Sequence, residues 1–300
     1  MTTLLLVRHG LTATTGQLLT GWTPGVGLDD RGRAQARALG ARIAAVPLDA
    51  IVTSPLDRCR QTVAELIAAR GPGSAGGPGS AGSAGGTGSA GGPGSAGGAG
   101  GPGSAGGTGS AANGRAGRTS DPVTDDRVGE CKYGDWTGRP LAELAKDPLW
   151  PVVQAHPSAV TFPGSGGESM LDMQHRAVAA VRDWNARLGK DATYLICSHG
   201  DVIKAIVADS LGLHLDQCQR IVADPCSLTV ISYTTLRPFL LRLNDTGGGV
   251  ADLLAPPQSQ RSGQPAEAGA LNNESDAVIG GGAGTAAEAG GAGTAHGAEG

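Results

Sequence analysis

Two short apolar segments of this sequence each end in the dipeptide His-Gly. The first runs over residues 5–10 and the second over residues 194–200. Such runs predict buried strands, and a glycine after the histidine lets the chain turn sharply. Ligands bind beyond the carboxyl ends of strands in open α/β sheets. We therefore expect His9 and His199 to meet in one crevice beside Arg8, where a histidine can attack a phosphate ester.

Further segments with residues that could take part in this chemistry lie around and between these two. They include Arg58, in the segment Ser-Pro-Leu-Asp-Arg at 54–58, and Glu130, in the segment at 129–138. Together with Gly-Trp at 21–22, the segment at 28–36 and Gly-Gly-Glu-Ser at 166–169, they occur in an order that resembles the histidine phosphatase superfamily, in its phosphoglycerate-mutase-like branch. The resemblance covers about residues 1–244, with one interruption.

The resemblance implies a role for each charged or polar residue of these segments. His9 would attack phosphorus and form a phosphohistidine, while the forked guanidinium groups of Arg8 and Arg58 bind the phosphate oxygens. His199 would donate further hydrogen bonds to the transferring group. Glu130 would protonate the leaving alcohol and then act as the base for the water that frees the enzyme. This chemistry needs no metal and no cofactor.

Several positions separate phosphatases from mutases in this branch. The glycolytic mutases of the family carry an acidic residue where this chain has Leu11, and an asparagine where Thr15 falls; the Thr15 hydroxyl can still bind phosphate. The segment at 139–164 is short, and its basic residues are Arg139 and Lys146. We therefore expect a metal-independent phosphomonoesterase acting on a small phosphorylated metabolite. A phosphomutase and a non-catalytic module that binds phosphorylated ligands are the alternatives.

Other site chemistries fit the sequence less well. His9, His199 and Glu130 have the ligand types that suit zinc, but two arginines aimed at the same place would repel a dication. No cysteine is followed by an arginine six positions later, as a cysteine phosphatase would need. Gly189-Lys190 is followed by an aspartate, so a nucleotide-binding P-loop is not indicated.

The elements that must position these residues alternate between strands and helices. This predicts an α/β fold, a three-layer sandwich with a mostly parallel central sheet and helices on both faces. The expected strands are residues 3–7, 50–53, 122–127 and 193–198, with a closing hairpin at 227–235 and 239–244. The expected helices are residues 31–45, 55–70, 168–188 and 201–213. Asp29 or Asp30 is expected to cap the first of them, and Ser54 the second.

Glycine accounts for 52 of the 300 residues and is concentrated in two stretches. Residues 71–118 and 246–300 have few large apolar side chains, which predicts a disordered insertion and a disordered tail around one domain spanning 1–245. The net charge of −4, without a basic run, disfavours nucleic acid and membranes as partners. We expect a cytoplasmic protein with reduced, mostly buried cysteines that binds a small phosphate monoester; its oligomeric state is left open.

Overall fold

The computed structural model describes residues 1–70 and 121–247. The insertion predicted at 71–118 lies outside these residues, and so does the predicted tail from residue 248 on. Within the described ranges, every helix is too short or too polar to cross a membrane. All five cysteines lie in these ranges, where they are buried and form no disulfide, as the sequence predicted.

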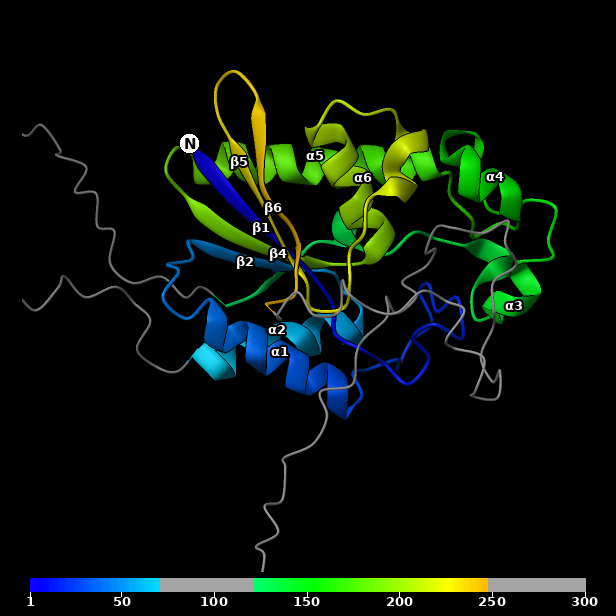
Figure 1. The fold of residues 1–300 in the computed structure, drawn as a ribbon, viewed down its shortest axis with the longest axis horizontal. Helices are drawn as coiled ribbons and strands as arrows, with labels where there is room; N and C mark the ends of the chain where they lie inside the picture. Colours follow the sequence, from blue (N-terminus) through cyan, green and yellow to red (C-terminus); the bar gives the residue numbers. More distant parts are fainter. Residues whose placement is uncertain (71–120, 248–300) are drawn as a thin grey trace, which may run out of the picture.

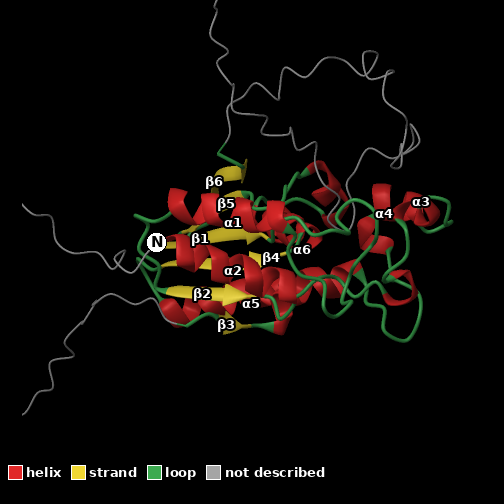
Figure 2. Ribbon diagram, turned by 90° about the horizontal axis from the view of Figure 1, so that it is seen from below, coloured by secondary structure: helices red, strands yellow, loops and turns green. Residues whose placement is uncertain are grey.

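A six-stranded sheet forms the centre of the molecule, with strand order β3-β2-β4-β1-β5-β6. Figure 2 shows the strands side by side in this order. The first four of them run parallel, while the β5–β6 hairpin packs antiparallel against β1. The predicted α/β class, the mostly parallel sheet and the closing hairpin are therefore confirmed. The strands are β1 (Thr2–Arg8), β2 (Ala50–Thr53), β3 (Val123–Thr124), β4 (Thr193–Ser198), β5 (Leu228–Tyr233) and β6 (Pro238–Asp245).

Helices cover both faces of the sheet (Figure 1). On one face α1 (Asp30–Arg42) and α2 (Asp57–Arg70) pack over a core that includes Leu5 and Val7 of β1. On the other face α5 (Met170–Leu188) and α6 (Gly200–Ser210) pack over a core that includes Leu4 and Leu6. Alternate residues of β1 thus serve opposite cores, which explains its unbroken apolar run. The shorter helices are η1 (Asp126–Val128), η2 (Gly134–Trp136), α3 (Leu141–Leu144), α4 (Trp150–Ala155), η3 (Pro157–Ala159) and η4 (Leu215–Arg220).

The register of β1 and β4 brings the two His-Gly segments together. Arg8 pairs with Ser198, so the two parallel strands end at the same level. The backbone N–H of His9 then donates to the Ser198 carbonyl at 3.0 Å. Both histidines therefore leave the sheet at the carboxyl ends of its parallel strands, as the sequence predicted.

Four predicted boundaries are wrong. Helix α1 ends at Arg42 and not at residue 45, because the chain turns after Arg42. Helix α2 begins at Asp57 and is not capped by Ser54, because the Leu56 carbonyl accepts the first helical bonds and the Ser54 hydroxyl contacts His199 instead. The strand expected over 122–127 is the two-residue β3, after which the chain turns into η1. Helix α6 ends at Ser210 and not at residue 213, because Gly212 takes a φ of +67°.

Candidate active site

His9 and His199 face each other beyond the ends of β1 and β4. Their ring centroids lie 5.2 Å apart, with the ring planes at 60°. Arg58, the second residue of α2, reaches between them. Its Nε lies 3.3 Å from His9 Nε2, and its Nη2 lies 3.2 Å from His199 Nδ1. Three residues that are far apart in the sequence thus form one polar cluster at the sheet edge.

The hydrogen bonds of His9 determine which of its nitrogens can react. Its Nδ1 lies 2.8 Å from the Gly10 carbonyl oxygen, which can only accept, so Nδ1 carries the proton and Nε2 keeps its lone pair. Burial lowers the pKa of His9 well below 6.5, and the charges of Arg58 and Arg8 lower it further. His9 is therefore neutral near pH 7. A side chain at Gly10 would clash with the Gly32 carbonyl at 2.6 Å, so this turn requires glycine.

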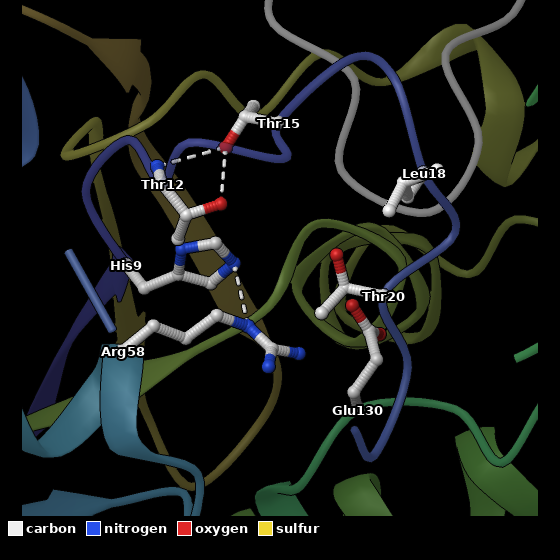
Figure 3. Close-up of a pocket in the computed structure, with 7 residues that line it drawn as sticks. All are labelled: His9, Thr12, Thr15, Leu18, Thr20, Arg58 and Glu130. Atoms are coloured by element: carbon white, nitrogen blue, oxygen red, sulfur yellow. Dashed lines mark hydrogen bonds between the residues drawn. The ribbon is translucent and has the colours of Figure 1, made fainter. Parts of the chain in front are cut away.

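A pocket opens above His9 and Arg58 (Figure 3). The buried Nη1 of Arg58 has no hydrogen-bond partner among the described residues. An unpaired guanidinium nitrogen at a pocket suits an anionic ligand such as phosphate. The lining residues are His9, Thr12, Thr15, Leu18, Thr20, Arg58 and Glu130.

Arg8 and His199 are not among the residues that line this pocket. Both are buried beside it. Arg8 is buried and donates from Nη1 to the Ala223 carbonyl at 2.6 Å. His199 Nε2 lies 2.7 Å from the Ser54 hydroxyl, and burial lowers the pKa of His199 well below 6.5. Thr15 does line the pocket, and its Oγ1 accepts from the Thr12 backbone N–H at 2.9 Å. The roles in phosphate binding expected of Arg8, His199 and Thr15 stay predictions.

Glu130 lies across the pocket from His9, as Figure 3 shows. Its side chain is buried, and Oε2 lies 3.7 Å from His199 Nδ1. Burial raises the pKa of Glu130 to about 7, and the charge of Asp201 adds to the rise while Arg58 and Arg8 oppose it. A large fraction of Glu130 is therefore protonated near neutral pH, as a proton donor must be.

The main chain at Glu130 is fixed by two side chains from distant elements. Arg176 of α5 donates to the carbonyls of Gly129 and Glu130, each at 2.8 Å, and pairs with Glu168. The indole Nε1 of Trp22 donates to the same Glu130 carbonyl at 2.6 Å. These contacts hold Glu130 on a segment that has no regular secondary structure of its own.

Sequence reasoning missed several residues of this site. The clearest is Asp201, which is buried in the first turn of α6 and accepts a 2.8 Å hydrogen bond from the Tyr133 hydroxyl. Lys204 lies 4.0 Å from the same carboxylate. The position of Asp201, two residues after His199, was the available signal, because an acid so close to a strand end can reach the same crevice. The others are Ser54, Thr12, Leu18, Thr20 and Arg176, which no charge pattern distinguishes.

Comparison with known proteins agrees with this architecture. A sequence profile described as "Histidine phosphatase superfamily (branch 1)" matches residues 4–75 and 108–246. The solved structure of YhfR from Bacillus stearothermophilus superposes with a TM-score of 0.59 at 25% identity, covering 82% of this chain and 98% of that one. Phosphoserine phosphatase from Entamoeba histolytica, in complex with 3-phosphoglyceric acid, superposes with a TM-score of 0.60 at 18% identity, covering 82% and 98%; this likeness concerns the fold alone.

Two curated relatives differ in what their names say they do. Glucosyl-3-phosphoglycerate phosphatase from Mycolicibacterium vanbaalenii is 32% identical over 108 residues, which are 33% of this chain and only 47% of that protein. A 2,3-bisphosphoglycerate-dependent phosphoglycerate mutase 2 from Gloeobacter violaceus is 25% identical over 231 residues, 75% of this chain and 83% of that protein. The profile match covers most of the chain, which therefore belongs to branch 1 of the histidine phosphatase superfamily, whose members aligned with it are phosphatases and mutases.

Proposed function

We propose that this protein is a metal-independent phosphomonoesterase that hydrolyses a small phosphorylated metabolite through a phosphohistidine. One observation carries the proposal. A neutral His9 whose unprotonated Nε2 accepts from Arg58 Nε, the guanidinium of Arg58 itself and a carboxyl group with a pKa of about 7 line one pocket. A nucleophile, an anion-binding group and a proton donor are what ester cleavage at phosphorus requires.

The first step forms the covalent intermediate. Arg58 binds the phosphate oxygens, and His9 Nε2 attacks phosphorus with its lone pair. The bond from phosphorus to the alcohol oxygen breaks as the P–N bond forms. Glu130 gives its proton to the departing oxygen, so the product leaves as a neutral alcohol. The Gly10 carbonyl accepts from Nδ1–H and stabilises the positive charge that develops on the imidazole.

The second step returns the enzyme to its starting state. Glu130, now a carboxylate, takes a proton from a water molecule while the water oxygen attacks phosphorus. The P–N bond breaks, its electron pair returns to His9 Nε2, and inorganic phosphate leaves. Glu130 is again protonated, and His9 is again neutral.

A phosphomutase is the second candidate, and the alignment with the Gloeobacter mutase over 75% of this chain favours it. In a mutase an alcohol, and not water, accepts the phosphoryl group from His9. The two reactions differ in their product, because hydrolysis releases inorganic phosphate and transfer yields a new ester. A binding module would retain phosphate and release no alcohol.

The experiment measures phosphate release from a panel of small monoesters in the presence of EDTA. The wild type is compared with His9→Ala and with His214→Ala, which removes an exposed histidine. We expect release that survives EDTA, disappears in His9→Ala and persists in His214→Ala. Acid-labile phosphate on the wild-type protein after a rapid quench identifies the phosphohistidine. Release that EDTA abolishes, or that His9→Ala retains, contradicts the proposal.

A further inference from the structure

The wall of the pocket beyond His9 and Arg58 consists largely of threonines. Thr12, Thr15 and Thr20 line it together with Leu18, all from the segment that follows β1 (Figure 3). In the proposed mechanism the leaving oxygen lies at Glu130, which lines the same pocket as this wall. The side chains of this wall can therefore contact the alcohol.

The threonine hydroxyls are held in place by one another. Thr12 Oγ1 lies 2.9 Å from Thr15 Oγ1 and 3.2 Å from Thr14 Oγ1, and Thr14 Oγ1 lies 3.1 Å from Thr20 Oγ1. A hydroxyl has one donor and two acceptor positions. Within the described part of the chain, Thr20 uses one of these three, toward Thr14. Its remaining donor and acceptor capacity is available to a ligand.

The charges at the pocket favour an alcohol part without charge. Arg58 is the only cation among the described lining residues, and the phosphate engages it. A second anionic group on the ligand would lie near Glu130, which becomes a carboxylate once its proton is transferred. Arg139 and Lys132 do not line the pocket and have other partners: the Arg139 guanidinium lies 3.9 Å from Glu143, and the Lys132 ammonium lies over the Trp22 ring.

We propose that the preferred substrates are phosphate esters of uncharged, hydroxylated alcohols, such as a sugar or polyol, over esters whose alcohol carries a carboxylate or a second phosphate. This inference rests on the proposed phosphatase function. The hydroxyls of such an alcohol exchange hydrogen bonds with Thr20 and Thr12, while Leu18 packs against its C–H groups and Thr15 keeps its expected role at the phosphate. Hydroxyls can both donate and accept, which suits a partner of the same kind.

The test compares two esters that differ at one carbon. Racemic glycerol 3-phosphate carries a CH₂OH group where racemic 3-phosphoglycerate carries a carboxylate. We expect kcat/KM for glycerol 3-phosphate to exceed that for 3-phosphoglycerate by about tenfold or more, because a desolvated charge without a partner costs a factor of this size. p-Nitrophenyl phosphate serves as a reference ester for turnover itself.

Variants show whether the pocket wall is responsible. Leu18→Lys places a cation in the wall and should shift the ratio of the two kcat/KM values toward 3-phosphoglycerate by about tenfold. Leu236→Lys adds the same charge at an exposed turn and should leave the ratio unchanged. Thr20→Val removes a hydroxyl of the wall and should raise KM for glycerol 3-phosphate more than KM for p-nitrophenyl phosphate.

The possible results separate this inference from the function on which it rests. Faster hydrolysis of glycerol 3-phosphate, with the shift in Leu18→Lys, supports the inference. Equal or faster hydrolysis of 3-phosphoglycerate overturns it and leaves the phosphatase intact. So does turnover of p-nitrophenyl phosphate with neither glycerol ester cleaved. If none of the three esters is hydrolysed in a reaction that requires His9, both the inference and the proposed function are overturned.

Discussion

Burial shifts the pKa values of two single residues, His9 and Glu130, in opposite directions. It lowers the pKa of His9 well below 6.5 and raises the pKa of Glu130 to about 7. The imidazole of His9 is therefore unprotonated and the carboxyl group of Glu130 largely protonated over the same range of pH. We expect kcat/KM to follow a bell-shaped profile, with its alkaline limb near pH 7 and its acid limb below pH 6.5.

Replacing Glu130 by glutamine tests its two roles separately. An ester with a good leaving group, such as p-nitrophenyl phosphate, needs little proton donation in the first step, whereas the second step still needs the base. Glu130→Gln should therefore release one equivalent of nitrophenol in a burst, followed by turnover slowed about 10²–10⁴-fold. Stopped-flow absorbance measures both phases. Steady turnover at the wild-type rate, without a burst, would show that Glu130 is not the base.

Asp201 offers a test of what sets the pKa of Glu130. Its negative charge is the second cause of the rise, after burial. Asp201→Asn removes that charge while Arg8 and Arg58 still favour the carboxylate, so the pKa of Glu130 should fall. The alkaline limb of the kcat/KM profile should then move to lower pH. Asp209→Asn, on the same helix but paired with the exposed Arg182, is the control and should not move it. An unshifted limb in Asp201→Asn would contradict this account.

Among the secondary-structure elements, α5 holds the proposed acid in position through one side chain. Arg176 donates to three carbonyls at the Glu130 segment, those of Arg127, Gly129 and Glu130. Arg176→Gln cannot make these contacts together, so Glu130 should lose its fixed position. We expect kcat to fall by about 10- to 100-fold, with KM changed less, since small misplacements of catalytic groups have effects of this size. Asp29→Ala, which removes the N-cap of α1, is the matched control.

The Asp29→Ala control should lower the free energy of unfolding by about 1 kcal/mol without the loss of kcat. Steady-state kinetics and urea denaturation on both variants distinguish positioning from general destabilisation. An equal loss of kcat in the two variants would show that Arg176 acts through stability alone.

The elements also show why parts of the site could be predicted and others could not. Apolar runs ending in His-Gly predicted β1 and β4, because strands buried on both faces leave a continuous signal. The start of α2 was misassigned because Ser54 resembles a helix cap, yet its hydroxyl contacts His199. The contacts of Arg176 depend on where α5 crosses the Glu130 segment, which is a property of tertiary packing. Nothing in the local sequence around Arg176 encodes that crossing.

In the folded molecule as a whole, the acid that we propose for catalysis lowers stability as pH rises from 4.5 to about 7. Glu130 has a pKa of about 7 in the fold and an ordinary value of 4.5, so the folded state binds this proton more tightly than the unfolded chain does. The free energy of unfolding is therefore highest below pH 4.5 on this account. It falls as pH rises toward 7, and the difference between the two pKa values corresponds to about 3 kcal/mol.

Glu130→Gln removes this dependence, because a glutamine does not titrate. The variant should therefore gain stability relative to the wild type as pH rises from 5 to 8, by up to about 3 kcal/mol. Urea denaturation of both proteins at each pH measures the gain. Glu143→Gln, at an exposed carboxylate, should give no such gain. A difference between Glu130→Gln and wild type that stays constant with pH would mean that Glu130 is ionised throughout, and with it the proton donor of the proposed mechanism would be lost.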